Sequence, residues 1–192
     1  SALTHVVLSH GHNDHTGGLT PFIEEKVAPA AKLIAHEDCF VGKYYGEEYI
    51  GAPYDVEQIL YLADCQLTAE PVAITENLWY LGEIPRKLDF EPRTVIGKRE
   101  RMGEWEEDDL LDDTALAYRT EKGLFIITGC AHSGICNIIE QAKAVCGDDR
   151  IIGVLGGFHL FEDDARAAAT AEYFARHHIP DLYPCHCVSL KV

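Results

Sequence analysis

Residues 9–19 read SHGHNDHTGGL, and this stretch decides how the rest of the chain is interpreted. Four metal-ligand side chains fall within six consecutive residues, namely His10, His12, Asp14 and His15. The run Val6-Val7-Leu8 before them is short and β-branched, which predicts a buried strand that ends where these side chains begin. Imidazole nitrogens and carboxylate oxygens suit zinc, iron or manganese. The stretch therefore predicts a metal site at the mouth of a sheet.

The spacing within this cluster indicates how its members divide between ions. His10 and His12 lie two residues apart and can face one ion, because Gly11 permits a tight turn between them. Asp14 and His15 follow, and we expect their side chains to point in the other direction from those of His10 and His12, so they can bind a second ion nearby. Isolated histidines often satisfy hydrogen bonds in a core, but four ligand-type side chains in six residues favour metal binding.

Later in the chain, predicted strands over residues 124–128, 151–155 and 181–183 are each followed by a histidine. These histidines are His132, His159 and His186. We expect this series to converge with the first cluster on one site.

Length and composition bound the class of protein. The 192 residues suffice for one domain with a real core, and 47% hydrophobic and 25% charged residues are ordinary for a globular protein. A net charge of -16 argues against nucleic acid and against anionic membrane as partners. No apolar run is long enough to span a bilayer and no signal peptide precedes Ser1, so we expect a soluble protein. Seven scattered cysteines, an odd number, favour the reducing cytoplasm over a disulfide scaffold.

Hydrophobic patterning predicts alternating helices and strands. A helix is expected over residues 20–28 and a strand over 32–36, with His36 interpreted as a surface histidine rather than one that faces the site. Residues 38–70 are irregular, aromatic and glycine-rich, which predicts either an insertion that roofs a pocket or a packed surface insertion. The acidic residues within 104–109 are expected to form a solvated loop.

The second half of the chain has clearer boundaries. Residues 115–128 predict a hairpin. Ser133 is the expected N-cap of a helix over 134–145, and Gly147 is its expected stop.

The H-x-H-x-D-H pattern resembles the signature of the metallo-β-lactamase superfamily. Further segments resemble one branch, the metal-dependent hydrolases named for dihydropterin-ribofuranosylaminobenzene-phosphate synthase; these are residues 4–12, 82–86, 127–135, 156–160 and 184–187. The resemblance implies a single α/β domain over residues 1–192, an αββα sandwich of two mixed sheets with helices outside. Relatives place a hairpin-rich segment before the motif, whereas here the motif begins at residue 10. Either these N-terminal strands are missing from the chain or another segment supplies them, and we expect that they are missing.

The resemblance also implies a ligand set for two divalent ions, with zinc favoured over iron or manganese. The first ion is assigned to His10, His12 and His132. The second ion is assigned to Asp14, His15 and His186. His159 is either a ligand in place of His186 or a pocket histidine that binds substrate or carries a proton.

Several positions in this set stay open. Many relatives have a bridging aspartate where this chain has Cys130, so the bridging ligand is Asp113, Cys130 or neither. Cys185 and Cys187 flank His186, and because neighbours in a strand alternate faces, at most one of them is a ligand. Arg86 follows a proline in a segment shared with the branch and is a candidate clamp for a phosphate or carboxylate.

The chemistry implied is hydrolysis by a metal-activated water, with Asp14 orienting the water. A phosphoester, phosphodiester or pterin-phosphate is the expected substrate, or the related pyrophosphate-displacing transfer, so the expected partner is a small phosphorylated molecule. Two alternatives remain: a non-catalytic metal-binding module, and a di-iron redox protein. The oligomeric state is not predicted.

Overall fold

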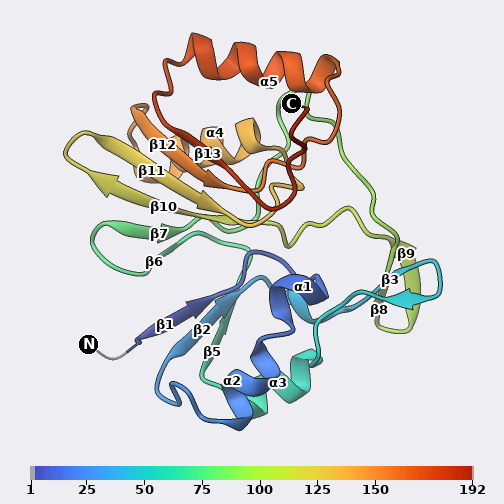
Figure 1. Ribbon diagram of the computed structural model, residues 1–192. Coiled ribbons are helices and arrows are strands. Elements are labelled where there is room, and N and C mark those ends of the chain that lie inside the picture. Colours follow the sequence, from blue (N-terminus) through green and yellow to red (C-terminus); the bar gives the residue numbers. More distant parts are fainter. Residues whose placement is uncertain (1–2, 192) are drawn as a thin grey trace. The chain divides into compact units, whose positions relative to one another are not determined.

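The computed structural model describes residues 3–191, and it has the mixed α/β class predicted from the sequence (Figure 1). The chain forms two compact units. Unit 1 contains the residues up to Ala69 together with Val95–Asp112, and unit 2 contains Glu70–Thr94 together with the residues from Asp113 onward. Each unit is thus built from two separate pieces of the sequence. Along residues 3–191, every helix is too short or too polar to cross a membrane.

Unit 1 is built on a parallel sheet in the order β1-β2-β5. Its strands are β1 (His5–Val7), β2 (Lys32–Ala35) and β5 (Cys65–Leu67). Helices α1 (Asn13–Thr16), α2 (Leu19–Glu24) and α3 (Val56–Leu62) connect them. Parallel neighbours need crossover connections, which these helices supply. Leu19, Leu33, Phe40 and Ile59 are among the buried side chains of its core.

A second sheet of unit 1 is antiparallel, in the order β4-β3-β8-β9. Its strands are β3 (Gly42–Tyr45), β4 (Glu48–Tyr49), β8 (Lys98–Arg101) and β9 (Glu104–Glu107), and the 3-10 helix η1 (Glu37–Phe40) precedes β3. The solvated loop expected over residues 104–109 is wrong. Glu104–Glu107 is an edge strand, and Asp108 and Asp109 are buried because they meet cations from β3 and β8.

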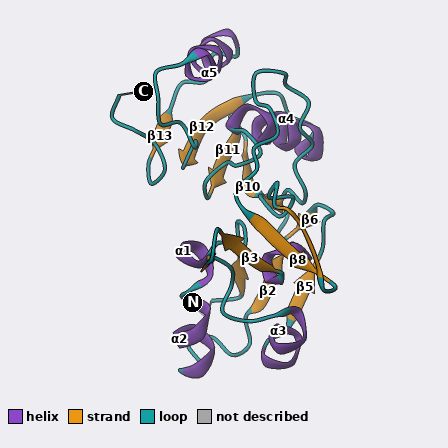
Figure 2. Ribbon diagram, turned by 90° about the vertical axis from the view of Figure 1, so that its right-hand side faces the viewer, coloured by secondary structure: helices purple, strands orange, loops and turns teal. Residues whose placement is uncertain are grey.

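Unit 2 contains one sheet in the order β13-β12-β11-β10-β7-β6. Its strands are β6 (Val72–Ala73), β7 (Leu78–Tyr80), β10 (Ala115–Thr120), β11 (Gly123–Thr128), β12 (Ile151–Gly156) and β13 (Leu182–Pro184). The strands β11, β12 and β13 are mutually parallel, whereas β10 runs antiparallel to β11 in the expected hairpin. Helix α4 (Ile135–Cys146) packs on β10 and β11, and α5 (Ala165–Arg176) contacts α4 (Figure 2).

Two helix boundaries differ from the predictions. The helix expected over residues 20–28 is α2, which ends at Glu24, and Lys26 adopts a left-handed φ of 51°. The predicted Ser133 cap is also wrong, because Gly134 is the N-cap residue of α4 and makes no side-chain cap. Glu91 takes that role instead, since its carboxylate accepts the backbone N–H groups of Cys136 and Asn137.

The expected segment 38–70 contains most of η1 and all of β3, β4, α3 and β5. Its first strands belong to the antiparallel sheet of unit 1, so the segment is ordered rather than irregular. Its part as a pocket roof, and the single domain over 1–192, stay predictions.

Candidate metal centre

The histidine cluster lies in the loop that leaves β1 and in the short helix α1, both in unit 1. His10 is fully buried and His12 is nearly so, whereas Asp14 is exposed. One ligand atom from each of these three residues lies within 4.8 Å of the others. Two imidazoles and a carboxylate are donors that zinc, iron and manganese accept, so these residues fit a divalent ion.

The two buried imidazoles face each other with their nitrogen atoms. His10 Nε2 lies 3.1 Å from His12 Nδ1. Two nitrogens bound tetrahedrally to one zinc ion at the usual bond length lie about 3.3 Å apart. The observed separation is that of a hydrogen bond between the two rings, and it is also close to the one that a shared ion imposes, so Nε2 of His10 and Nδ1 of His12 fit as donors to one ion.

Ser9 contacts one ring nitrogen each of His10 and His15. Its hydroxyl lies 3.1 Å from His10 Nδ1 and 3.3 Å from His15 Nδ1. A hydrogen bond at one ring nitrogen fixes the tautomer and orientation of an imidazole, which leaves the other nitrogen for metal. The Nε2 atom of His15 lies 3.3 Å from Asp14 Oδ2, so the two residues assigned to a second ion are also neighbours.

The protonation state of His12 suits a ligand. Burial lowers its pKa, and the positive charge of Lys43 lowers it further. Because the metal-binding form of imidazole is neutral, both effects favour the form that binds an ion.

Backbone contacts hold the loop between the histidines. A Cβ at Gly11 would approach the Cα atom of Cys39 to 2.8 Å, closer than packed atoms tolerate. The N–H of Gly11 donates to Asp112 Oδ2 at 2.6 Å, and the N–H of Asn13 donates to Ile50 O at 2.8 Å. Gly11 is therefore required here for close approach to the η1 backbone, in addition to the turn expected from the sequence.

Unit 2 places three of its histidines along one edge of its sheet. His132 follows β11, His159 follows β12 and His186 follows β13. Since these strands are parallel, their carboxyl ends lie on the same edge. His132 is buried, and its ring centroid lies 4.5 Å from that of His159. His186 is exposed.

The backbone at this edge adopts an unusual conformation. Ala131, His159 and His186 have φ values of 55°, 50° and 58°. Residues other than glycine rarely adopt this left-handed region, and such positions cluster at functional sites. The sequence contained no signal for this, because nothing in the side-chain pattern distinguishes these positions from ordinary strand ends.

The candidates for a bridging ligand are also in unit 2. Cys130 is buried, and its carbonyl accepts a hydrogen bond from Cys187 Sγ at 3.4 Å. A hydrogen bond with the side chain of Cys130, distinct from the bond to its carbonyl, lowers the pKa of Cys187 to about 7. Asp113 is buried and accepts the N–H of Ser133 at 2.8 Å, which holds the turn after His132. The choice among Asp113, Cys130 and neither stays open.

Two further sequence candidates have clear positions. Arg86 is half-buried in the segment after β7, and Asn137 anchors this segment by accepting the N–H groups of Lys87 and Leu88. Its role as an anion clamp stays a prediction. His36 was expected at the surface, which is wrong: it is 3% exposed, and its Nδ1 accepts the N–H of Asp38 to cap η1.

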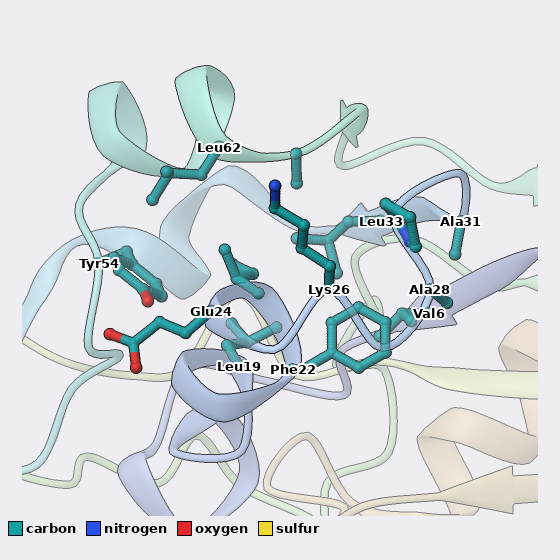
Figure 3. Close-up of a pocket in the computed structure, with 13 residues that line it drawn as sticks. Val6, Leu19, Phe22, Glu24, Lys26, Ala28, Ala31, Leu33, Tyr54 and Leu62 are labelled. Carbon is teal, nitrogen blue, oxygen red and sulfur yellow. The ribbon is translucent and has the colours of Figure 1, made fainter.

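Unit 1 also contains an apolar cavity of about 530 Å³ between α2, α3 and the parallel sheet (Figure 3). Val6, Leu19, Phe22, Leu33 and Leu62 are among the side chains that line it, with the polar groups of Glu24, Lys26 and Tyr54. Its lining includes none of the candidate metal ligands, so the cavity is separate from the histidine cluster.

Comparison with known proteins gives consistent results. The model of the metallo-beta-lactamase superfamily matches residues 1–145. The uncharacterized protein MJ0448 of Methanocaldococcus jannaschii is 36% identical over 189 residues, which cover 97% of this chain and 70% of the relative. The 7,8-dihydropterin-6-methyl-4-(beta-D-ribofuranosyl)-aminobenzene-5'-phosphate synthase of the same organism is 31% identical over 198 residues, and the match covers 97% of this chain and 66% of that protein.

A solved structure is similar as well. The crystal structure of Tm1679, described as a metal-dependent hydrolase of the beta-lactamase superfamily, matches with a TM-score of 0.80 and 31% identity. The match covers 96% of this chain and 69% of that one. The chain thus spans between 66% and 70% of the length of these three proteins.

Proposed function

The chain belongs to the metallo-beta-lactamase superfamily, and from this premise we propose that it is a dinuclear metal-dependent hydrolase. The observation that carries the proposal is the cluster in unit 1, where donor atoms of His10, His12 and Asp14 lie within 4.8 Å of one another. The burial of His10 and His12 and the lowered pKa of His12 support a site prepared for a cation. Zinc is the favoured ion, and iron and manganese are alternatives for this donor set.

A divalent ion bound by such residues supplies Lewis acidity and activates water for hydrolysis. The residues of the chain then have distinct roles in the proposal. Asp14 is exposed enough to meet solvent and orients the attacking water. His159, half-buried at the sheet edge of unit 2, binds the substrate or carries a proton. His15, His132 and His186 complete the ligand set predicted from the sequence.

The proposed substrate is a small phosphorylated molecule. The name of one relative refers to a pterin-containing phosphate ester, which supports a phosphoester, a phosphodiester or a pterin-phosphate, or the related transfer that displaces pyrophosphate. Arg86 is the proposed clamp for its phosphate, since guanidinium binds phosphate through paired hydrogen bonds. The cytoplasm is the proposed location, on the basis of the odd and scattered cysteines.

Metal content tests the proposal directly. We expect elemental analysis of protein purified without added metal to give about two equivalents per chain, falling toward one in Asp14→Ala. Glu57→Ala, an exposed acid on α3, is the matched control and should keep both equivalents. One equivalent or less, unchanged by Asp14→Ala, would contradict the dinuclear site and favour a non-catalytic metal-binding module.

Activity is the second measurement. Hydrolysis of a chromogenic phosphomonoester and phosphodiester should be detectable in the metal-loaded protein, disappear with a chelator and return when zinc is added. Asp14→Ala should lower kcat by about a hundredfold or more, because it removes both a ligand and the group that orients water. Flavin-dependent redox activity with iron bound, in place of hydrolysis, would support the di-iron alternative.

A further inference from the structure

A buried ion network underlies the histidine loop of unit 1. Lys43, on β3, is fully buried, and its ammonium group lies 2.9 Å from Asp108 Oδ2 and 3.0 Å from Asp112 Oδ1. Both carboxylates are fully buried as well. Such a group is costly to bury unless its charges are paired, so each member depends on the others.

Asp112 connects this network to the metal loop. Its two oxygens divide between two donors: Oδ1 accepts from Lys43, and Oδ2 accepts the N–H of Gly11 at 2.6 Å. Gly11 is the residue between the two buried imidazoles. The ammonium group thus fixes the carboxylate, and the carboxylate fixes the peptide from which His10 and His12 project.

Lys43 is charged in this position. Burial lowers the pKa of its ammonium group, but the neighbouring Asp112 and Asp108 outweigh burial and raise it above its ordinary value. The two carboxylates therefore favour the ammonium form of the lysine, which is the form that donates to Asp112.

We propose that Lys43 and Asp112 are positioning residues that set the separation of the His10 and His12 donor atoms and thereby the affinity for metal. This inference rests on the proposed function, because it assumes that these imidazoles bind an ion. Mutation of groups that orient metal ligands without contacting the metal typically lowers metal affinity about ten- to a hundredfold.

The direction in which Lys43→Met changes the metal affinity distinguishes a positioning role from a purely electrostatic one. Lys43→Met removes a buried positive charge, and by Coulomb attraction alone this would tighten the binding of a cation. Loss of the positioning contact would weaken binding instead. Asp112→Asn is nearly isosteric, but an amide NH2 group replaces one of the two carboxylate oxygens, so either the Gly11 N–H or the Lys43 ammonium group faces a donor instead of an acceptor.

Arg99 on β8 provides the matched control. It is a buried cation of the same charged region, and its contacts are to Asp38, Glu106, Asp108 and Asp109 rather than to Asp112. Arg99→Met therefore removes a buried charge that contacts Asp108, but it leaves both contacts of Asp112, to Lys43 and to the N–H of Gly11, in place.

The experiment is a zinc competition titration with a chromophoric chelator, made on the full chain after removal of its metal. Circular dichroism and thermal unfolding give the folded fraction of each variant. We expect Lys43→Met and Asp112→Asn to weaken zinc binding about ten- to a hundredfold, and Arg99→Met to stay within about threefold of the wild type. If Lys43→Met does not fold, the zinc affinity of Asp112→Asn tests the proposal, with the same expected loss of about ten- to a hundredfold.

The outcomes separate the two proposals. Zinc binding by Lys43→Met or Asp112→Asn that equals or exceeds that of the wild type overturns the positioning role and leaves the proposed function standing. A wild-type protein that binds no zinc, iron or manganese overturns the proposed function, and the positioning role with it.

Discussion

At the scale of single residues, the candidate site depends on groups that place the imidazoles as much as on the imidazoles themselves. Ser9 contacts the outer nitrogens of His10 and His15, and Asp112 holds the peptide of Gly11. Each contact fixes the orientation of an imidazole ring or a backbone torsion angle before an ion binds, so less conformational entropy is lost on binding. The loop is therefore organised for binding by its neighbours in the fold.

Gly11 gives the sharpest prediction at this scale. In Gly11→Ala the new methyl group would meet the η1 backbone at Cys39, which cannot move as a flexible side chain can. The loop must shift, so we expect zinc affinity to fall more than tenfold and stability to fall by about 1–3 kcal/mol. Competition titration and thermal unfolding measure both. Gly18→Ala is the control, because a Cβ at Gly18 meets nothing within 4 Å; equal losses in the two variants would contradict the explanation.

The sequence predicted the local parts of this arrangement and missed the distant ones. The residues from His10 to His15 are close together in the sequence, so their spacing alone predicts a metal site. Lys43 carries no comparable signal, because its two partners lie 65 and 69 residues away and only the fold brings them together. The same reason explains the wrong prediction for the acidic residues within 104–109. In the sequence Asp108 resembles a solvated charge, because its partner Lys43 on β3 is far away along the chain.

At the scale of elements, α4 shows how a distant side chain replaces a local cap. Ser133 has the right position and chemistry for an N-cap, yet Glu91, 45 and 46 residues away from its partners, accepts the N–H groups of Cys136 and Asn137. Gly134, with φ of +95°, lets the chain pass close to that carboxylate. Sequence rules describe what a local cap prefers, and a buried carboxylate on both N–H groups is stronger than the local alternative.

Glu91→Ala should therefore destabilise the protein by about 2 kcal/mol, because two buried N–H groups lose their acceptor. Thermal unfolding and amide exchange at the start of α4 measure the loss. Asp89→Ala, an exposed acid in the same segment, should change stability by less than about 0.5 kcal/mol. A Glu91→Ala variant as stable as Asp89→Ala would show that water or Ser133 replaces the cap.

The contact between α4 and α5 should depend on pH. Burial raises the pKa of Glu140, but the hydrogen bonds from Lys143 and Tyr173 outweigh burial and lower it below its ordinary value of 4.5. A lowered pKa in the folded state means that this contribution is full above the unfolded pKa and is lost as the pH falls through the folded pKa. Wild type should therefore exceed Glu140→Gln in melting temperature at pH 7, and the two should converge as the pH falls below the ordinary value of 4.5 and through the lowered pKa. Parallel curves across this range would contradict the assignment.

At the scale of the whole molecule, a metal ion that binds the folded chain and not the unfolded chain should stabilise the fold. Zinc at about a hundred times its dissociation constant should add about 2.7 kcal/mol, which raises the melting temperature by about 5–10 °C. A chelator should reverse the change. Differential scanning calorimetry with and without chelator measures it, and Asp14→Ala should show a smaller shift; identical curves would argue against a bound ion.

The division of each unit into two pieces of sequence has a consequence for synthesis on the ribosome. The contact between Gly11 and Asp112 joins residues 101 positions apart, and Lys43 is also synthesised long before Asp112, its partner. The imidazoles therefore leave the exit tunnel long before the groups that arrange them. A nascent chain that has not yet exposed residue 112 should bind metal weakly and exchange it freely, so high-affinity loading becomes a late event in biogenesis, reached only when the second piece of unit 1 has emerged.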